Sequence, residues 1–345
     1  MFYEEKCTLC GECLMKCPYL AYSEDNAKEE FQKLINGEPS PVTSDCITCV
    51  ACNMICPEGA NPFDLINIRQ EETGTFQFGK RFLKMFDMGT KMPSKIIKGE
   101  PDKPVMSLCL FGDMLPGVFE GQLFDGSTFL KGGDYFCWIG MVHSGRPSLV
   151  NKKNIQTFVD NLASSSSGAE EIILIHDDCY ATLTNKVKEF DITVPFKPIH
   201  IIEYLRDYVK AHQDQINKLN IKVAYQQPCA SRYTFEKDKI LDELFELIGA
   251  DRVKRKYDKE HALCCGGIQA AMENVSTEEE NKWRMKGILD AKEAGAEAYV
   301  FLCPLCIMGN RGRAKGEGME PYILSNLVRV ALGEELTHGG AGKKL

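Results

Sequence analysis

Cysteines recur in the N-terminal part of this chain at short gaps that are repeated. Two runs share the spacing C-x2-C-x2-C-x3-C, and a proline follows each run: Cys7, Cys10, Cys13 and Cys17, then Cys46, Cys49, Cys52 and Cys56. Three thiolates two residues apart can ligate three irons of one cubane, while the fourth cysteine ligates the other cluster. Zinc sites use pairs of ligands rather than such triplets. We therefore predict two [4Fe-4S] clusters, one on Cys7, Cys10, Cys13 and Cys56 and one on Cys46, Cys49, Cys52 and Cys17.

A second cysteine pattern occupies the C-terminal half. It consists of a single cysteine, a Cys-Cys-Gly-Gly run and a Cys-x2-Cys pair: Cys229, Cys264, Cys265, Cys303 and Cys306. The first of these follows a predicted strand, Ile221–Tyr225, and the fourth follows another, Tyr299–Leu302. The carboxyl ends of parallel strands meet in the crevice where such folds bind ligands. Five thiols are more than one cubane uses. The alternative is a Cys-Cys pair that packs as two small hydrophobic residues.

An earlier segment repeats this pattern with substitutions. Its matching residues are Cys109, Cys137, His176 and Cys179, and the 39 positions from Cys137 to His176 equal those from Cys264 to Cys303. Trp138 and His176 then occupy two of the five ligand positions, so we expect no five-thiolate cluster here. The Cys3His set suits tetrahedral zinc. An empty, packed site with three reduced thiols is the alternative.

The hydrophobic pattern predicts how these residues are positioned. Helical periodicity at 26–35 indicates a helical N-terminal region, and from Val105 onward short apolar runs alternate with amphipathic stretches. Such alternation is typical of an α/β protein with parallel sheets. We expect a helical ferredoxin domain with two clusters, a linker, two α/β repeats and a flexible tail, with these bounds: 1–70, 71–104, 105–215, 216–337 and 338–345.

This order of motifs resembles the CCG-domain family of iron–sulfur proteins. It is most similar to the fused, D-type subunit of heterodisulfide reductase, with related subunits in lactate, glycolate and anaerobic glycerol-3-phosphate dehydrogenases. The N-terminal part resembles the helical ferredoxin of succinate dehydrogenase. The resemblance implies tandem CCG repeats and a non-cubane [4Fe-4S] cluster, held by the five cysteines of the second repeat, which are also the catalytic residues: Cys229, Cys264, Cys265, Cys303 and Cys306.

The resemblance implies an oxidoreductase subunit. Electrons would pass through two cubane clusters to the non-cubane cluster for thiol/disulfide redox within a multi-subunit complex. The alternative is an electron-relay subunit of a flavin-dependent or quinone-linked dehydrogenase, or of a bifurcating complex, with no substrate bond chemistry on this chain. Because the sequence has no nucleotide-binding fingerprint, we expect a flavoprotein or a membrane cytochrome anchor as partner, and a small thiol or disulfide as substrate.

Composition narrows the possible partners and the cellular location of this protein. The chain has 345 residues, 44% of them hydrophobic, and a formal net charge of −8. The acidic balance argues against nucleic acid as a partner. No apolar run approaches a membrane span, and no apolar stretch typical of a signal peptide follows Met1. We expect a cytoplasmic protein that reaches a membrane only through a partner subunit.

Two further groups of polar residues lie near cysteines along the chain. Arg232 lies three residues after Cys229 and is predicted to bind an anionic group of a substrate. Asp177 and Asp178 follow His176 and are predicted to form a solvated turn or a helix cap.

Overall fold

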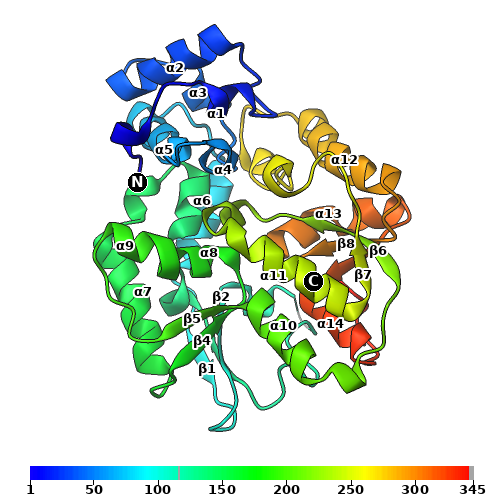
Figure 1. Cartoon of the computed structure of the whole chain (residues 1–345). Helices are drawn as coiled ribbons and strands as arrows, with labels where there is room; N and C mark the ends of the chain where they lie inside the picture. Colours follow the sequence, from blue (N-terminus) through cyan, green and yellow to red (C-terminus); the bar gives the residue numbers. More distant parts are fainter. Residues whose placement is uncertain (116, 342–345) are drawn as a thin grey trace.

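The computed structural model describes residues 1–115 and 117–341 (Figure 1). Its N-terminal part is helical: every regular element within residues 1–73, all of which are described, is a helix. The α-helices are α1 Glu12–Met15, α2 Glu24–Asn36, α3 Val42–Asp45, α4 Ala51–Ile55 and α5 Pro62–Thr73. The helix predicted over 26–35 is therefore α2, which ends at Gly37, a glycine with φ +73°. These helices position both runs of four cysteines without any strand.

Two sheets follow the helical part. The first contains β1 Lys95–Ile97, β2 Val105–Cys109, β3 Thr128–Lys131, β4 Glu171–Leu174 and β5 Lys197–His200, in the order β1-β3-β2-β4-β5. The second contains β6 Ile221–Gln226, β7 Ala250–Arg252, β8 Ala298–Phe301 and β9 Glu320–Ile323, in the order β7-β6-β8-β9. All neighbours are parallel except β1, which is antiparallel to β3. Without β1, the two sheets have the same strand order, as a tandem repeat requires.

Helices connect the strands and cover the sheets. They are α6 Lys80–Gly89, α7 Lys152–Ser165, α8 Asp177–Ala181, α9 Val187–Glu189, α10 Ile201–Ala211, α11 Asp238–Ile248, α12 Thr277–Glu293, α13 Pro304–Gly316 and α14 Leu324–Ala331. One hydrophobic core joins apolar residues of β2, β4 and β5 to those of β6 and β8 through α10, α11 and α14. Because the two sheets pack on this one core, the carboxyl ends of their strands are held in place relative to one another (Figure 1).

The structure differs from the predicted elements in several places. Strand β1 lies within residues 71–104, where the sequence predicts a linker with some helix at residues 81–86, and it extends the first sheet; helix α6 covers the helix predicted there. The sequence pattern of Thr277 with Glu280 three residues later predicts a capping box at Thr277. Helix α12 is instead capped one residue earlier by Ser276, whose side chain accepts a hydrogen bond from the Glu279 backbone N–H.

The predicted flexible tail is only partly within the described residues. Residues 338–341 are described, and the carbonyl of Gly340 accepts hydrogen bonds from the Ile323 N–H at 2.9 Å and from Asn326 Nδ2 at 3.2 Å. This part of the tail therefore packs at the end of β9. Among the described residues, no helix combines the length and apolarity needed to cross a membrane.

Candidate metal centres

The cysteines of the two N-terminal runs gather around two neighbouring cavities. Four of them, three from the first run and one from the second, line one cavity: Cys7, Cys10, Cys13 and Cys56. The other four line a second cavity, with Cys13 also at its wall: Cys17, Cys46, Cys49 and Cys52. The structure thus brings the last cysteine of each run to the other run's group. All sixteen cysteines of the chain are free, so no disulfide competes for these thiols.

The environment of these thiols suits a bound metal cluster. Metal ligation requires thiolates and releases their protons, and four converging thiols without disulfide bonds form a donor set of the kind that iron–sulfur clusters use. The residues present therefore fit a cubane in each cavity.

The five cysteines of the second repeat form a chain of sulfur contacts. Cys229 opens the 3-10 helix η8 (Cys229–Tyr233) after β6, and its Sγ lies 3.8 Å from Sγ of Cys264. Cys264 also contacts Cys265, which in turn contacts Cys306. Cys303 caps the N-terminus of α13 and contacts Cys306 in its first turn. Strand ends and a helix N-terminus therefore converge on one buried group of five sulfurs.

These contacts change the acidity of the thiols unequally. Sulfur contacts from Cys264 and then Cys306 lower the pKa of Cys265 to about 5. The contact with Cys306, assisted by the nearby imidazole of His176, lowers the pKa of Cys303 to about 5. The same contacts raise the pKa of Cys306 well above its ordinary value. Cys265 and Cys303 are therefore the members of the group that lose their protons most readily, as metal ligation requires.

The Cys-Cys-Gly-Gly run depends on a buried arginine that the sequence motifs did not indicate. Gly266 adopts φ +81°, and a Cβ there would lie 2.5 Å from Cγ of Arg284. The Arg284 guanidinium donates to the carbonyls of Cys265 at 2.8 Å and Gly266 at 3.1 Å. A residue with a side chain at 266 would displace this arginine, so glycine is required for the arrangement of the loop.

Two side chains connect the second cysteine run to the five-cysteine site. Arg232 is 2% exposed and donates to the carbonyls of Cys49 at 2.9 Å and Ala262 at 2.5 Å. The hydroxyl of Tyr19 accepts a hydrogen bond from the Cys264 backbone N–H at 2.8 Å. The predicted role of Arg232 in binding a substrate anion is therefore wrong, because its guanidinium is buried and used between two cysteine-bearing loops.

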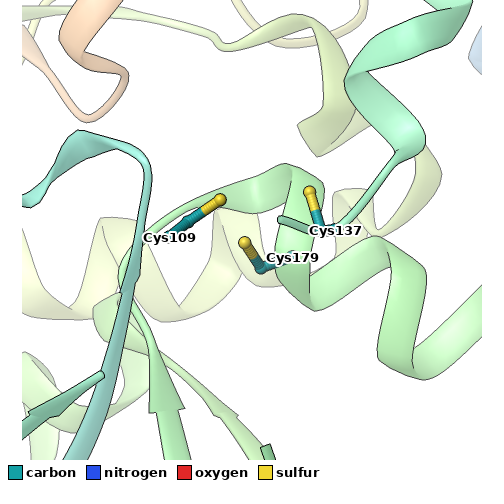
Figure 2. A group of neighbouring side chains, drawn as sticks. All are labelled: Cys109, Cys137 and Cys179. Atoms are coloured by element: carbon teal, nitrogen blue, oxygen red, sulfur yellow. The ribbon is translucent and has the colours of Figure 1, made fainter. Parts of the chain in front are cut away.

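The three cysteines of the first repeat also converge. Sγ atoms of Cys109, Cys137 and Cys179 lie within 4.8 Å of one another, and Figure 2 shows them pointing toward a common centre. Cys109 ends β2, Cys137 lies in the loop before Trp138, and Cys179 lies in α8. Sulfur contacts from Cys137 and Cys179 lower the pKa of Cys109 well below its ordinary value. Three buried thiols in this arrangement fit zinc.

His176 lies outside this group of three. Its Nδ1 is 2.9 Å from a carboxylate oxygen of Asp178, and its ring faces Cys303 of the second repeat. The structure therefore does not assemble the predicted Cys3His set. The spacing along the sequence placed His176 at the correct strand end, but it carried no information on the direction of the side chain.

Of the two aspartates after His176, Asp177 is buried rather than solvated, whereas the side chain of Asp178 is 13% exposed. Asp177 lies in the first turn of α8, and its side chain is 1% exposed. It contacts Lys237 Nζ at 3.0 Å and His200 Nε2 at 3.3 Å. Burial alone would raise the pKa of Asp177, but the charge of Lys237 and the hydrogen bond from His200 together outweigh it and hold the pKa well below the usual range. Asp177 thus joins the first repeat to the second.

Comparisons with known proteins agree with this division of the chain. Residues 6–61 match the 4Fe-4S dicluster domain family, and residues 223–309 match the CCG cysteine-rich domain family. The D-type subunit of dihydromethanophenazine:CoB–CoM heterodisulfide reductase from Methanosarcina mazei is 22% identical, with 96% of this chain and 94% of the relative covered. The corresponding subunit of Methanosarcina barkeri is 22% identical, with 95% and 94% covered.

A solved structure supports the fold alone. A hypothetical protein from Helicobacter pylori aligns with a TM-score of 0.55 and 11% identity, covering 81% of this chain and 59% of the other. The present chain therefore spans somewhat more than half of that protein. Taken together, the cysteine geometry and the comparisons show a chain that joins a 4Fe-4S dicluster domain to a CCG cysteine-rich domain and is homologous along nearly its whole length to the D-type subunits of heterodisulfide reductases.

Proposed function

We propose that this chain is an electron-transferring iron–sulfur subunit of a heterodisulfide reductase-like complex. Single electrons pass between two cubane clusters, held by the N-terminal cysteines, and a non-cubane [4Fe-4S] cluster held by the five cysteines of the second repeat. At that cluster a small-molecule disulfide is reduced, or two thiols are oxidised. The similarity to heterodisulfide reductase subunits over nearly the whole chain supports this assignment.

The observation that carries the proposal is the direct connection between the second cysteine run and the five-cysteine site. Arg232 donates to the Cys49 carbonyl, and its charge raises the stability of the thiolate forms of both Cys49 and Cys229. Cys49 also shares one hydrophobic core with Cys264, Cys265, Cys303 and Cys306. A dry, packed path between two redox sites is what electron transfer within a protein needs.

The chemistry balances with two electrons and two protons for each disulfide. Reduction breaks one S–S bond and gives two thiols, so the chain must deliver two single electrons in sequence. When bound, the clusters supply one-electron transfer and an iron site for a substrate sulfur. The protein's residues hold the five cysteines together, bury all of them but Cys229, which is partly exposed, and place the fixed charge of Arg232 beside them.

We also propose a zinc ion on Cys109, Cys137 and Cys179. Three converging thiols, one of them with a strongly lowered pKa, suit a tetrahedral metal better than a packed core. The partner subunits are other redox proteins, a flavoprotein or a membrane cytochrome anchor. The chain itself is then cytoplasmic and associates with a membrane only through such a partner.

A thiol-dependent paramagnetic signal tests the proposed function. The purified protein is oxidised with and without an excess of a coenzyme-type thiol and examined by EPR. We expect a signal that requires the thiol and that is lost in Cys264→Ser, whereas Cys137→Ser retains it. An unchanged spectrum, with normal electron flow from a flavoprotein, would exclude substrate binding and leave the electron-relay function.

A further inference from the structure

The imidazole of His176 has a buried ring nitrogen that lacks a hydrogen-bond partner among the described residues. His176 is 3% exposed, and its Nε2 makes no hydrogen bond of regular geometry with any described residue. A buried polar atom without a partner is costly, and such an atom calls for a specific explanation, a bound ion or group among them. The imidazole contacts the side chain of Cys303, one of the five sulfurs of the second repeat.

The direction of the ring is fixed from its other side. Nδ1 lies 2.9 Å from the Asp178 carboxylate and 3.3 Å from the Asp178 backbone N–H. The ring of Phe111 packs on the imidazole at a centroid distance of 4.7 Å. With Nδ1 occupied and one face covered, only the Nε2 edge remains for a group in the second repeat.

The backbone beside His176 is also tied to the second repeat. Asp177, the next residue, contacts Lys237 Nζ at 3.0 Å, and Lys237 lies shortly after the helix that Cys229 opens. His176 caps the N-terminus of α8, and Cys303 caps that of α13. The two residues hold equivalent positions in their repeats, so the shared core brings them face to face.

We propose that His176, although it belongs to the first repeat, is a positioning residue of the five-cysteine site and donates a hydrogen bond from Nε2 to the sulfur of Cys303 when the cluster is bound. This inference rests on the proposed function, which makes Cys303 a cluster ligand. When the Asp178 N–H donates to Nδ1, the ring proton lies on Nε2, as the donation requires.

Hydrogen bonds to cluster sulfurs stabilise the reduced cluster, because that state carries more negative charge on sulfur. The fixed imidazole would therefore raise the reduction potential of this cluster and favour its acceptance of electrons from the cubanes. The first repeat thus contributes a donor where the second repeat contributes a ligand.

The test compares two buried histidines with the same local role. His200 also caps a helix, α10, with its Nδ1 3.2 Å from the Ile202 N–H, but it contacts Asp177 rather than a cysteine. We expect His176→Asn to shift the midpoint potential of the non-cubane cluster to more negative values and to alter its EPR signal. The cubane signals and zinc content remain as in the wild type. His200→Asn leaves the potential unchanged.

The measurement is a redox titration of the whole chain, followed by EPR and without added thiol, so it does not depend on turnover. An unaltered potential and spectrum in His176→Asn, with the third cluster present, would overturn the inference. His176→Asn could instead lose the iron of that site alone. In that case His176→Gln should restore the iron, because its longer side chain also carries an amide donor. An equal loss of iron in His200→Asn, or in His176→Gln, would show a folding effect and overturn the inference. About eight irons per wild-type chain would show that the third cluster is absent, and this result would contradict both the proposed function and the inference that rests on it.

Discussion

The two repeats of this chain have the same strand order but different side chains at equivalent positions. The second repeat presents five sulfurs joined in a chain of pairwise contacts, whereas the first presents three within 4.8 Å of one another, with Trp138 and His176 at the other two positions. The first group is sealed, with Cys109, Cys137 and Cys179 no more than 2% exposed. The comparison teaches that the fold supplies a place for a metal centre, and that the residues at a few strand ends decide which centre forms.

The repeats also differ in their neighbours. The second lies against the ferredoxin helices through Arg232 and Tyr19, whereas the first meets them through His143, whose Nδ1 is 2.7 Å from the Thr48 carbonyl. Of the two sites, as far as the described residues go, it is the second that shares a core with a cysteine of the N-terminal runs. We therefore expect electrons to reach the second repeat and not the first.

The largest expected difference between the repeats is in iron content. Cys264→Ser should lower the iron content by about four per chain, because the five-sulfur set is broken. The equivalent change in the first repeat, Cys137→Ser, should leave the iron content unchanged and remove zinc. Metal analysis of both purified variants measures the difference, and iron loss of equal size in both would contradict the division of roles.

The contact between the repeats should account for the next largest effect. Lys237→Met leaves Asp177 buried with one partner fewer, and breaking a buried pair in this way costs about 3–5 kcal/mol in the free energy of unfolding. Lys197→Met removes the same charge from an exposed pair with Glu171 and should have a much smaller effect on the free energy of unfolding. Denaturant unfolding compares the two; equal losses would show that the Asp177 contact does not join the repeats.

His200 should make stability depend on pH. Burial, partly offset by Asp177, lowers its pKa to about 4 in the folded chain, against about 6.5 when unfolded. Below pH 6.5 the unfolded state takes up a proton that the folded state does not, so stability is lost as the pH falls from about 6.5 to 4, by about 3 kcal/mol in total. His200→Asn should lose less stability over this range in unfolding experiments at matched pH, and parallel curves would contradict the assignment.

The smallest expected effect concerns the hydroxyl of Tyr19. Tyr19→Phe removes the acceptor for the Cys264 N–H and should cost about 1 kcal/mol. Tyr22→Phe, in the same loop but with a half-exposed ring, is the control. We expect the EPR signal of the five-cysteine site to change in Tyr19→Phe only. A change of equal size in both variants would show that the Tyr19 hydroxyl does not connect the ferredoxin helices to the second repeat.

Much of the fold follows from local sequence patterns, and the remainder depends on tertiary contacts. The helical N-terminal part and the parallel sheets are predictable, because cysteine spacing and hydrophobic periodicity are local signals. Strands β3, β5, β7 and β9 were not predicted, since each has only three or four residues and includes a charged residue or proline. The orientations of His176 and Arg232 come from packing between the repeats and against the ferredoxin helices, which spacing along the chain does not encode.

Metal content of the intact protein tests the central claim most directly. Two cubanes, one non-cubane cluster and one zinc predict about twelve irons and one zinc per chain. The purified chain, kept under anaerobic conditions and analysed for both metals together with protein concentration, should give these values. About sixteen irons without zinc would show that the first repeat also holds a cluster, and about eight irons would show that the five cysteines hold none; either result would contradict the account.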